Sequence, residues 1–409
     1  MKICLVSAYF TPLEIGGAEK AARRLAENLA ARGWEVVVLT TWPRDETLVL
    51  PSGVKVCRIR PGAVFFKDGS VPIPGLRRWL WRMRNVWNAA VYRKTRQILE
   101  REKPRLVNIH NYAPFSPAVF AAAFAQKLPV VFTAHDYFPL CRHYSFEKNG
   151  RPCRGHCLAC RLWSRWNRRY LAGASVVYLS GYSRSVYRRC LKPLAEAVLP
   201  NPVDLSDEQI TGIRGEKESL RSRQPSRPVT WLFLGRLDPL KGIRSVMRCW
   251  EQLAAPDVRL WIAGDGPLAG EVRAWAEGRP GVEYLGLVSG EKKHGVLVAA
   301  DGLLLPTRPA DVSPLVIAEA LGYGVPVLGS HAGAVPELIR PGVTGWLCDC
   351  ADAGAFSRRV AEISRDPQLI RSLSAGCFAA ARERTYERYM PQIMAYYEAI
   401  AAGREDGVR

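Results

Sequence analysis

Short apolar runs alternate with segments of helical spacing along the chain, and this alternation restricts the possible folds more than any other feature of the sequence. In the first half the apolar runs are KICLVSAY, WEVVVLTT, PRLVNIH, LPVVFTAHD and ASVVYLSG. In the second half they are VTWLFLG, VRLWIAGDG, VEYLGLV, DGLLLP and VPVLGS. Continuous apolar strands separated by helices are typical of parallel sheets that helices cover on both faces. The sequence therefore predicts an α/β protein with two doubly wound, Rossmann-like domains.

The length of 409 residues also favours two domains, because a single hydrophobic core stops growing at roughly 250 to 300 residues. We expect a first domain over residues 1–205, a polar linker over 206–228 and a second domain over 229–375. The remaining residues, 376–409, are expected to be helical and could pack back on the first domain. Two such domains that face each other present the carboxyl ends of their strands to an interdomain cleft, which is a natural ligand site.

Composition excludes disordered and fibrous chains and gives no sign of a membrane span. Apolar residues make up 48% and charged residues 23% of the chain, as in globular proteins. No run of apolar residues is long enough for a transmembrane helix, and the start, MKICLVSAYFTP, does not resemble a secretory signal peptide. Eleven cysteines in such a chain fit a reducing compartment. We therefore expect a cytoplasmic protein.

The formal charge of +20 favours an anionic partner: nucleic acid, an anionic membrane surface or a phosphorylated substrate. The segment Arg77–Arg105 carries ten Lys or Arg against two Glu, and it interleaves them with Trp79, Trp81, Trp87 and Tyr92. A basic, aromatic helix of this kind suits the headgroup layer of an anionic membrane, where a lipid-linked acceptor would be found. It could also be a solvated helix with a buried aromatic stripe, and contact with nucleic acid is the least favoured reading.

Two adjacent glycines, Gly16 and Gly17, lie between the first predicted strand and the first predicted helix. Glycine lets backbone N–H groups approach a ligand closely, and the N-terminus of a helix favours an anion. The same pair would also serve in an ordinary loop and helix cap. Phosphate contact is therefore one of two interpretations of this loop.

The stretch FLGRLDPLKG follows the first strand of the second predicted domain and carries Arg236 and Lys241. Asp238, Pro239 and Gly242 are residues that shape tight turns. Two cations on a rigid loop at the end of a strand suit a diphosphate, because Arg binds two oxygens at once and Lys is a compact charge. A solvated basic turn is the alternative.

The stretch DVSPLVIAEALGYGVPVLGS places Asp311 eight residues before Glu319, which interrupts an otherwise apolar helix. A carboxylate accepts hydrogen bonds from the vicinal hydroxyls of a ribose or another sugar. The exposed N–H groups of Leu315 and Val316, at the start of that helix, could hold phosphate. A solvated acid on an amphipathic helix would not explain the position of Glu319, because buried acids need partners.

These motifs together resemble the GT-B fold glycosyltransferases of family 4, which are retaining and use nucleotide sugars. The resemblance is carried by the glycine loop, GRLDPLKG, IAGDGPL and the stretch from Asp311 to Leu347, and it covers nearly the whole chain. It implies two facing Rossmann-like domains with the nucleotide mostly on the second. One departure is that the family's paired glutamates are Asp311 and Glu319 in this chain.

The resemblance also implies roles for individual residues. Arg236 and Lys241 would neutralise the diphosphate leaving group, Glu319 would hold the ribose, and Asp311 would contact the transferred sugar. His135, in TAHD at the end of a predicted strand, matches a family histidine that contacts the donor sugar near the reacting carbon. Taken by itself, this residue could equally be a satisfied core histidine.

The resemblance further implies that backbone groups near Leu287 and Val288 recognise the base and that catalysis needs no metal ion. The expected activity is transfer of a hexose-type unit to a glycan or polyprenyl-linked acceptor in cell-surface polysaccharide synthesis, by a protein peripheral to the inner face of the cell membrane. An epimerase or phosphorylase of similar fold is a first alternative. A non-enzymatic RNA-binding or scaffold protein on a degenerate GT-B fold is a second, although Arg236, Lys241 and Glu319 are all present.

Four cysteines, Cys141, Cys153, Cys157 and Cys160, follow the strand that ends at the TAHD motif. Four thiolates could form a tetrahedral, structural zinc site that staples a loop with little to pack against. An iron–sulfur cluster and free thiols are the alternatives. The spacing is irregular for a zinc ribbon.

Overall fold

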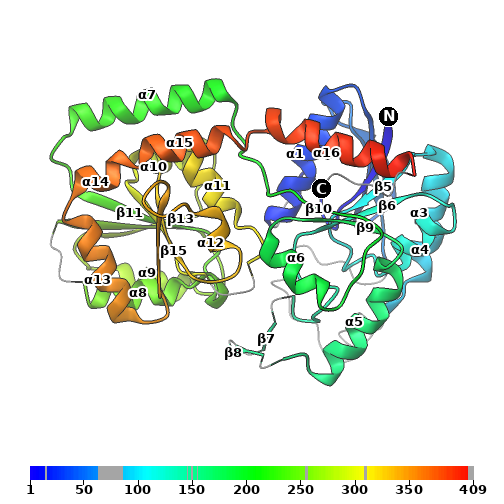
Figure 1. Cartoon of the computed structure of the whole chain (residues 1–409), viewed down its shortest axis with the longest axis horizontal. Helices are drawn as coiled ribbons and strands as arrows, with labels where there is room; N and C mark the ends of the chain where they lie inside the picture. Colours follow the sequence, from blue (N-terminus) through cyan, green and yellow to red (C-terminus); the bar gives the residue numbers. More distant parts are fainter. Residues whose placement is uncertain are drawn as a thin grey trace. The chain divides into compact units, whose positions relative to one another are not determined.

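The computed structural model describes the chain except for residues 14–15, 63–85, 145, 149–150, 154, 254–256, 308–310 and 404–409. The chain divides into two compact units, each with its own central sheet (Figure 1). The first unit comprises Met1–Glu147, Cys153–Pro200 and Tyr389–Arg409. The second unit comprises Lys148–Pro152 and Asn201–Arg388.

The sheet of the first unit has the strand order β10-β9-β6-β5-β1-β2-β4-β3, and all its pairs are parallel except β3 with β4. Its strands are β1 (Lys2–Val6), β2 (Glu35–Thr41), β3 (Glu46–Val49), β4 (Lys55–Ile59), β5 (Leu106–Ile109), β6 (Val130–Ala134), β9 (Ser175–Tyr178) and β10 (Glu196–Val198). β7 (Glu147–Lys148) and β8 (Arg151–Pro152) form a separate pair. Central strands such as β5 and β6 are buried along their whole length, as their apolar sequences predict.

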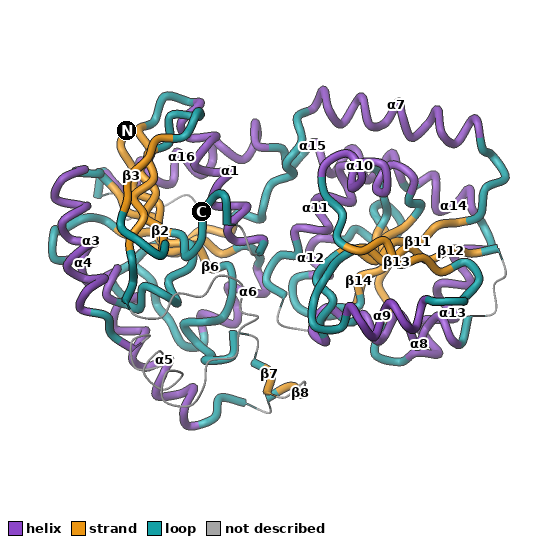
Figure 2. The backbone as a smooth tube through the Cα atoms, turned by 180° about the vertical axis from the view of Figure 1, so that it is seen from behind, coloured by secondary structure: helices purple, strands orange, loops and turns teal. Residues whose placement is uncertain are grey.

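Helices flank this sheet, and the strands lie at the centre of the unit (Figure 2). The helices are α1 (Gly17–Ala31), α3 (Ala89–Glu102), α4 (Ala118–Phe124), α5 (Leu158–Leu171), α6 (Gly181–Arg188) and α16 (Tyr386–Ala401). In α1 the buried side chains include Ala22, Leu25, Ala26 and Leu29, which recur at helical spacing. The expected sequence of strand, loop and helix at the start of the chain is confirmed.

The second unit repeats the doubly wound arrangement with the strand order β13-β12-β11-β14-β15-β16, and every pair is parallel. Its strands are β11 (Val229–Leu234), β12 (Val258–Ala263), β13 (Val282–Gly286), β14 (Gly302–Leu305), β15 (Val327–Ser330) and β16 (Gly345–Cys348). The order reverses between β11 and β14, so the loops after these two strands lie at a topological switch point, where ligands of α/β proteins commonly bind.

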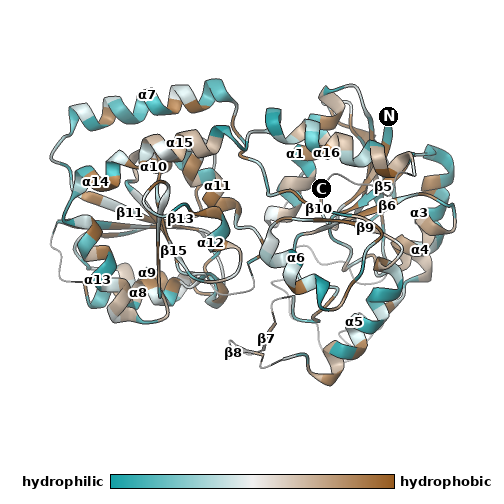
Figure 3. Ribbon diagram, viewed as in Figure 1, coloured by the Kyte–Doolittle hydropathy of each residue, from teal (hydrophilic) through white to brown (hydrophobic). Residues whose placement is uncertain are grey.

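A hydrophobic core lies on each face of this second sheet. One core contains residues of α7 (Asp207–Arg223), α10 (Gly290–Ala299), α11 (Leu315–Gly322), α12 (Val335–Leu338) and α15 (Ser374–Arg382). The other contains residues of α8 (Ile243–Glu251), α9 (Ala269–Ala276), α13 (Ala353–Ser364) and α14 (Pro367–Ser372). In Figure 3 the strands between these two layers are mainly apolar.

The prediction of a linker over 206–228 is wrong, because most of this segment forms helix α7 of the second unit. Ser206 caps this helix by accepting a hydrogen bond from the N–H of Gln209. Only Ile210, Ile213 and Lys217 are buried, and much of the helix surface is hydrophilic (Figure 3). So few buried positions give a weak apolar period, which is why the sequence resembles a linker.

The predicted boundary at residue 376 also differs from the structure. Helices α14 and α15 and the start of α16 belong to the second unit, and the chain joins the first unit from Tyr389 onward. Within the first unit the hydroxyl of Tyr397 donates to Oδ1 of Asn108 on β5 at 3.0 Å, and Tyr397 contacts the ring of Trp34. The later part of α16 thus packs in the first unit's core.

Candidate active site

The glycine loop of the first unit caps helix α1, which follows it. The N–H of Gly16 donates to Oε2 of Glu19 at 2.9 Å, and Oε1 of Glu19 accepts a hydrogen bond from Asn111 at 2.8 Å. Glu19 is 7% exposed, so its carboxylate fills the space next to the start of α1. The structure therefore gives Gly16 and Gly17 a role in capping α1, and their contact with phosphate stays a prediction. Sequence reasoning missed Glu19, although an acid at the third position of a helix is a known capping signal.

His135 directly follows β6, as the sequence predicts, and it has a partner that sequence reasoning missed. Nε2 of His135 lies 2.8 Å from Nδ1 of His110, and the two rings stack with 5.1 Å between their centroids. His110 directly follows β5, the neighbouring parallel strand, so both histidines lie at the same edge of the sheet. The only signal for this pair was a histidine at the end of each of two apolar runs.

Burial controls the protonation of this pair. It lowers the pKa of His135 to about 4 and the pKa of His110 well below its ordinary value. Burial also raises the pKa of the adjacent Asp136 to about 6, although its carboxylate accepts a hydrogen bond from the N–H of Phe138. At neutral pH both rings are therefore uncharged, and one donates the hydrogen bond that the other accepts.

The loop after β11 is held by backbone hydrogen bonds to Asp238 and carries the two predicted cations. Oδ1 of Asp238 accepts from the N–H groups of Leu240 and Lys241 at 2.9 and 3.0 Å, which caps the short 3-10 helix Pro239–Lys241. Gly242 has a φ of 77°, and a Cβ atom there would lie 2.1 Å from the carbonyl oxygen of Pro306. The side chain of Arg236 is 61% exposed, with its Nε 3.4 Å from Asp238.

Lys241 and Asp311 meet at the ends of the adjacent strands β11 and β14. Nζ of Lys241 lies 2.5 Å from Oδ2 of Asp311, and the hydroxyl of Thr307 donates to the same oxygen at 3.2 Å. Ser330, at the end of β15, donates to the carbonyl of Thr307 at 2.7 Å and so connects β15 to the loop after β14. The side chain of Asp311 is 14% exposed, so its carboxylate needs polar partners, which Lys241 and Thr307 provide.

Glu319 also has a cationic partner, which the sequence did not reveal. Its Oε1 lies 2.6 Å from Nζ of Lys293 in α10. Glu319 thus has a cationic partner, although it is not a buried acid as the sequence argument assumed. Both side chains remain partly exposed, at 34% for Glu319 and 24% for Lys293, so a ligand can reach them.

The other predicted donor-binding residues occupy the same unit. Leu315 and Val316 form the first turn of α11, and Pro314 is the N-terminal cap of this helix. Leu287 and Val288 follow β13, where Leu287 is 75% exposed and Val288 is 6% exposed. Their part in phosphate and base recognition stays a prediction.

The structure brings Cys141, Cys157 and Cys160 close to one another. Sγ of Cys160 lies 3.8 Å from Sγ of Cys141, and Cys157 hydrogen-bonds to Cys160, whose pKa burial raises to about 12. Two thiolates bound to one tetrahedral zinc ion at about 2.3 Å each also lie about 3.8 Å apart. Within the described ranges no group of three or more His, Cys, Asp or Glu is arranged to hold a metal ion. The four-thiolate site, including Cys153, stays a prediction.

The basic aromatic segment falls only partly on described residues, because 63–85 lie outside them. Trp87 contacts Tyr92 and Tyr170, with ring centroids 5.9 and 6.3 Å apart, and Trp87 is 39% exposed. The described part of the segment thus contributes an aromatic cluster against α5. No helix among the described residues has the length and apolar character needed to cross a membrane.

Two family models match the chain. Residues 15–207 match the model described as Glycosyltransferase Family 4, and residues 228–366 match the model described as Glycosyl transferases group 1. The two matches divide near the boundary between the structural units, which lies between Pro200 and Asn201. Each unit therefore corresponds to a known glycosyltransferase domain.

Curated relatives carry related names. The phosphatidyl-myo-inositol mannosyltransferase of Mycolicibacterium smegmatis is 27% identical, over 98% of this chain and 94% of the relative. The GDP-mannose-dependent alpha-mannosyltransferase of Corynebacterium glutamicum is 24% identical, over 98% and 90%. The N-acetyl-alpha-D-glucosaminyl L-malate synthase of Bacillus anthracis is 26% identical over 41% of this chain, and the match spans only 44% of that relative. A 42.6 kDa Klebsiella pneumoniae protein of the cps region, 29% identical, is likewise matched over 44% of its length.

Solved structures share the fold. The sucrose-phosphate synthase of Thermosynechococcus elongatus superposes with a TM-score of 0.74 at 20% identity, over 98% of this chain and 99% of that chain. Anabaena HepE in complex with UDP and glucose superposes with a TM-score of 0.69 at 19% identity, over 97% and 98%. With the family matches and the two doubly wound units, these comparisons identify the chain as a glycosyltransferase of the GT-B fold that is similar to family 4.

Proposed function

We propose that the chain is a retaining glycosyltransferase that moves a sugar from a nucleoside-diphosphate sugar to a glycan or lipid-linked acceptor in the synthesis of a cell-surface polysaccharide. The observation that carries this proposal is the presence of two cation–carboxylate pairs, Lys241 with Asp311 and Lys293 with Glu319. All four side chains are partly exposed. Exposed pairs contribute little to stability, so a ligand can replace either partner at small cost.

In this proposal, binding of the donor breaks the pair of Lys241 with Asp311, and each of the two residues then contacts the donor instead. Phosphate oxygens take over Lys241 and are also bound by Arg236, whose exposed guanidinium can form a two-pronged contact. Asp311 then accepts hydrogen bonds from hydroxyls of the sugar, and Glu319 accepts them from the ribose. Lys241 and Arg236, rather than a metal ion, balance the charge of the diphosphate.

The reaction breaks the bond between the anomeric carbon and the β-phosphate oxygen and forms a bond from that carbon to the acceptor oxygen on the same face. The acceptor proton passes to the departing phosphate. Charge develops on the leaving group, so preorganised cations and the N–H groups of Leu315 and Val316 lower the barrier. His135 is neutral at working pH and contacts the donor sugar next to the positively charged anomeric centre.

The relatives support a sugar nucleotide and a membrane-bound acceptor. Two are named as mannosyltransferases, one of them dependent on GDP-mannose and the other acting on phosphatidyl-myo-inositol. The solved structure of HepE holds UDP and glucose. We accordingly place the protein on the cytoplasmic face of the membrane, as a peripheral enzyme, with the basic aromatic segment as its contact.

Thermal unfolding with UDP, GDP, ADP, dTDP and CMP tests the donor site. One nucleoside diphosphate should stabilise the protein selectively, by about 2.7 kcal/mol at one hundred times its dissociation constant. Lys241→Ala should lose most of this stabilisation. Arg248→Ala, which removes an exposed cation of the neighbouring helix α8, should keep it. Equal stabilisation of the Lys241→Ala variant and the wild type would contradict the proposal.

A further inference from the structure

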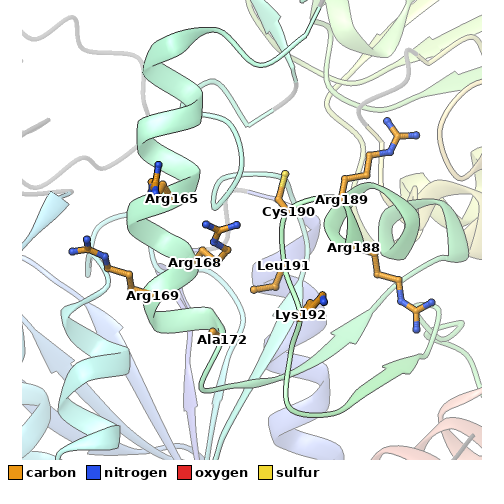
Figure 4. Close-up of a pocket in the computed structure, with 9 residues that line it drawn as sticks. All are labelled: Arg165, Arg168, Arg169, Ala172, Arg188, Arg189, Cys190, Leu191 and Lys192. Atoms are coloured by element: carbon orange, nitrogen blue, oxygen red, sulfur yellow. The ribbon is translucent and has the colours of Figure 1, made fainter.

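A basic pocket in the first unit has no part in the site described above. Its volume is about 450 Å³, and it opens between α5 and the segment that follows α6 (Figure 4). The residues that line it are Arg165, Arg168, Arg169, Ala172, Arg188, Arg189, Cys190, Leu191 and Lys192. Five arginines and one lysine thus surround one cavity.

The surrounding sequence offers almost no acid to balance these cations. From Arg151 to Pro200 the chain has ten Lys or Arg and a single acidic residue, Glu196. Glu196 is already shared by Arg184, at 2.8 Å, and Arg188. Among the described residues, no carboxylate forms an ion pair with the other cations of the pocket, which are Arg165, Arg168, Arg169, Arg189 and Lys192.

The cations come from two elements, α5 and the segment around the end of α6. Figure 4 shows Arg168 projecting from α5 toward the facing segment that carries Cys190, Leu191 and Lys192. Burial raises the pKa of the Cys190 thiol, and the positive charges of Arg168 and Arg189 lower this pKa in part. The charges of Arg168, on α5, and of Arg189, just after α6, thus both act on this thiol.

Stabilisation of helix ends explains only part of this cluster. Helices α5 and α6 both end at the pocket, and cations in the last turn of a helix are favoured by its dipole. This accounts for Arg168 and Arg169 in α5 and for Arg188 in α6. It does not account for Arg165, which is more than one turn from the end of α5, or for Lys192, which lies beyond α6.

We propose that this pocket binds a phosphate or diphosphate group through Arg168 and Lys192. Guanidinium groups donate two parallel hydrogen bonds to phosphate oxygens, and the lysine adds a compact charge. The anion also relieves the mutual repulsion of cations that have no carboxylate partner. The inference rests on the proposed function for the role of this group, which is the phosphate of a lipid-linked acceptor. A soluble phosphorylated acceptor presents the same chemistry.

Cys190 provides a local readout, because it lines the pocket and its side chain is partly accessible. We would alkylate the full chain with N-ethylmaleimide and follow the Cys190 peptide by mass spectrometry, with inorganic pyrophosphate or with sodium sulfate at equal ionic strength. Pyrophosphate should slow alkylation of Cys190 and leave that of the exposed Cys157 unchanged. The donor site does not contribute to this signal, since neither cysteine lies in the second unit.

Matched variants give the decisive comparison. Arg168→Gln and Lys192→Gln should each need at least about fivefold more pyrophosphate for the same protection, because each removes one charged contact. Arg161→Gln makes the same change on an exposed residue of α5 that does not line the pocket, so it should behave as the wild type. Protection is compared as the ratio of rates with and without pyrophosphate, since the substitutions also change the intrinsic reactivity of the thiol.

Vesicles distinguish the two sources of phosphate. Phosphatidylcholine vesicles that contain phosphatidic acid should protect Cys190 more than pure phosphatidylcholine vesicles if the ligand is lipid-borne, whereas protection by soluble pyrophosphate alone assigns the pocket to a soluble ligand. The inference is wrong if neither probe slows alkylation of Cys190, or if Arg168→Gln and Arg161→Gln are protected equally. Nucleotide stabilisation through Lys241 is measured independently, so the pocket and the proposed donor site can fail separately.

Discussion

His110 and His135 stack at the carboxyl ends of the adjacent strands β5 and β6, with Nδ1 of His110 2.8 Å from Nε2 of His135. Because burial keeps both rings neutral, this hydrogen bond fixes the orientation of His135 without adding charge. In the proposed reaction His135 contacts the donor sugar. His110 is then a positioning residue that acts through His135.

Substituting His110 should slow turnover more than it weakens substrate binding. His110→Leu removes the hydrogen bond, so we expect kcat to fall roughly fivefold to tenfold with little change in KM, since a net hydrogen bond contributes on the order of 1 kcal/mol. His110→Asn keeps a hydrogen-bonding group and should retain more activity. Steady-state kinetics of both variants test this, and an unchanged kcat in His110→Leu would show that His110 has no positioning role.

Acidification should destabilise the protein through His135. Its pKa is about 4 in the folded chain and about 6.5 when unfolded. Between these values the unfolded chain binds a proton that the folded chain does not, so stability falls as the pH falls through this window. From pH 7 to pH 5 the wild type should lose about 2 kcal/mol more than His135→Asn in urea unfolding. The raised pKa of Asp136, about 6, makes the protein more stable as the pH falls, and this effect is present in both proteins. Equal losses would contradict the assignment.

Removing Glu319 should abolish transfer and leave the fold intact. Glu319→Ala leaves Lys293 without its partner, but the pair is partly exposed, so the cost in stability should stay below about 1 kcal/mol. Glu218→Ala, which breaks the exposed pair of Glu218 with Arg214 on α7, is the control for loss of a surface carboxylate. A Glu319→Ala enzyme with the wild-type rate of sugar transfer would exclude the proposed role.

The loop that carries Lys241 should be sensitive to a methyl group at Gly242. Gly242 and Gly278 have similar positive φ angles, 77° and 71°, but only at Gly242 would a Cβ atom meet backbone, 2.1 Å from the oxygen of Pro306. Gly242→Ala should therefore lower the free energy of unfolding by roughly 1 to 3 kcal/mol more than Gly278→Ala. It should also weaken binding of the stabilising nucleotide. Thermal unfolding of both variants, with and without nucleotide, measures the difference.

The cysteine cluster makes a prediction about metal content. If four thiolates bind zinc, the purified protein should carry one zinc ion per chain, and Cys157→Ser should lose it with a fall in thermal stability. Cys377→Ser, at a buried cysteine of the second unit, should retain the metal. Metal analysis of the three proteins decides the matter, and full zinc content in Cys157→Ser would disprove the four-thiolate site.

Some features of the chain follow from local sequence. Strands such as β1, β6 and β11 are buried on both faces, so their apolar runs are continuous and their positions are predictable. The sequence does not reveal helix α7, because one of its three buried positions is the polar residue Lys217. Nζ of Lys217 donates to the carbonyls of Leu297, Val298 and Ala300 at 3.3, 2.8 and 2.7 Å, so a charged side chain takes a place where the pattern requires an apolar one.

The sequence by itself determined the α/β class, the two doubly wound halves and the polar residues at strand ends, because these depend on apolar periodicity and turn chemistry within short windows. Only the tertiary structure decided which of those residues meet. His110 meets His135 because β5 and β6 are neighbours, and Lys241 meets Asp311 because β11 and β14 are neighbours. Strand order is a property of the whole packed sheet, so no local stretch of sequence specifies these pairs.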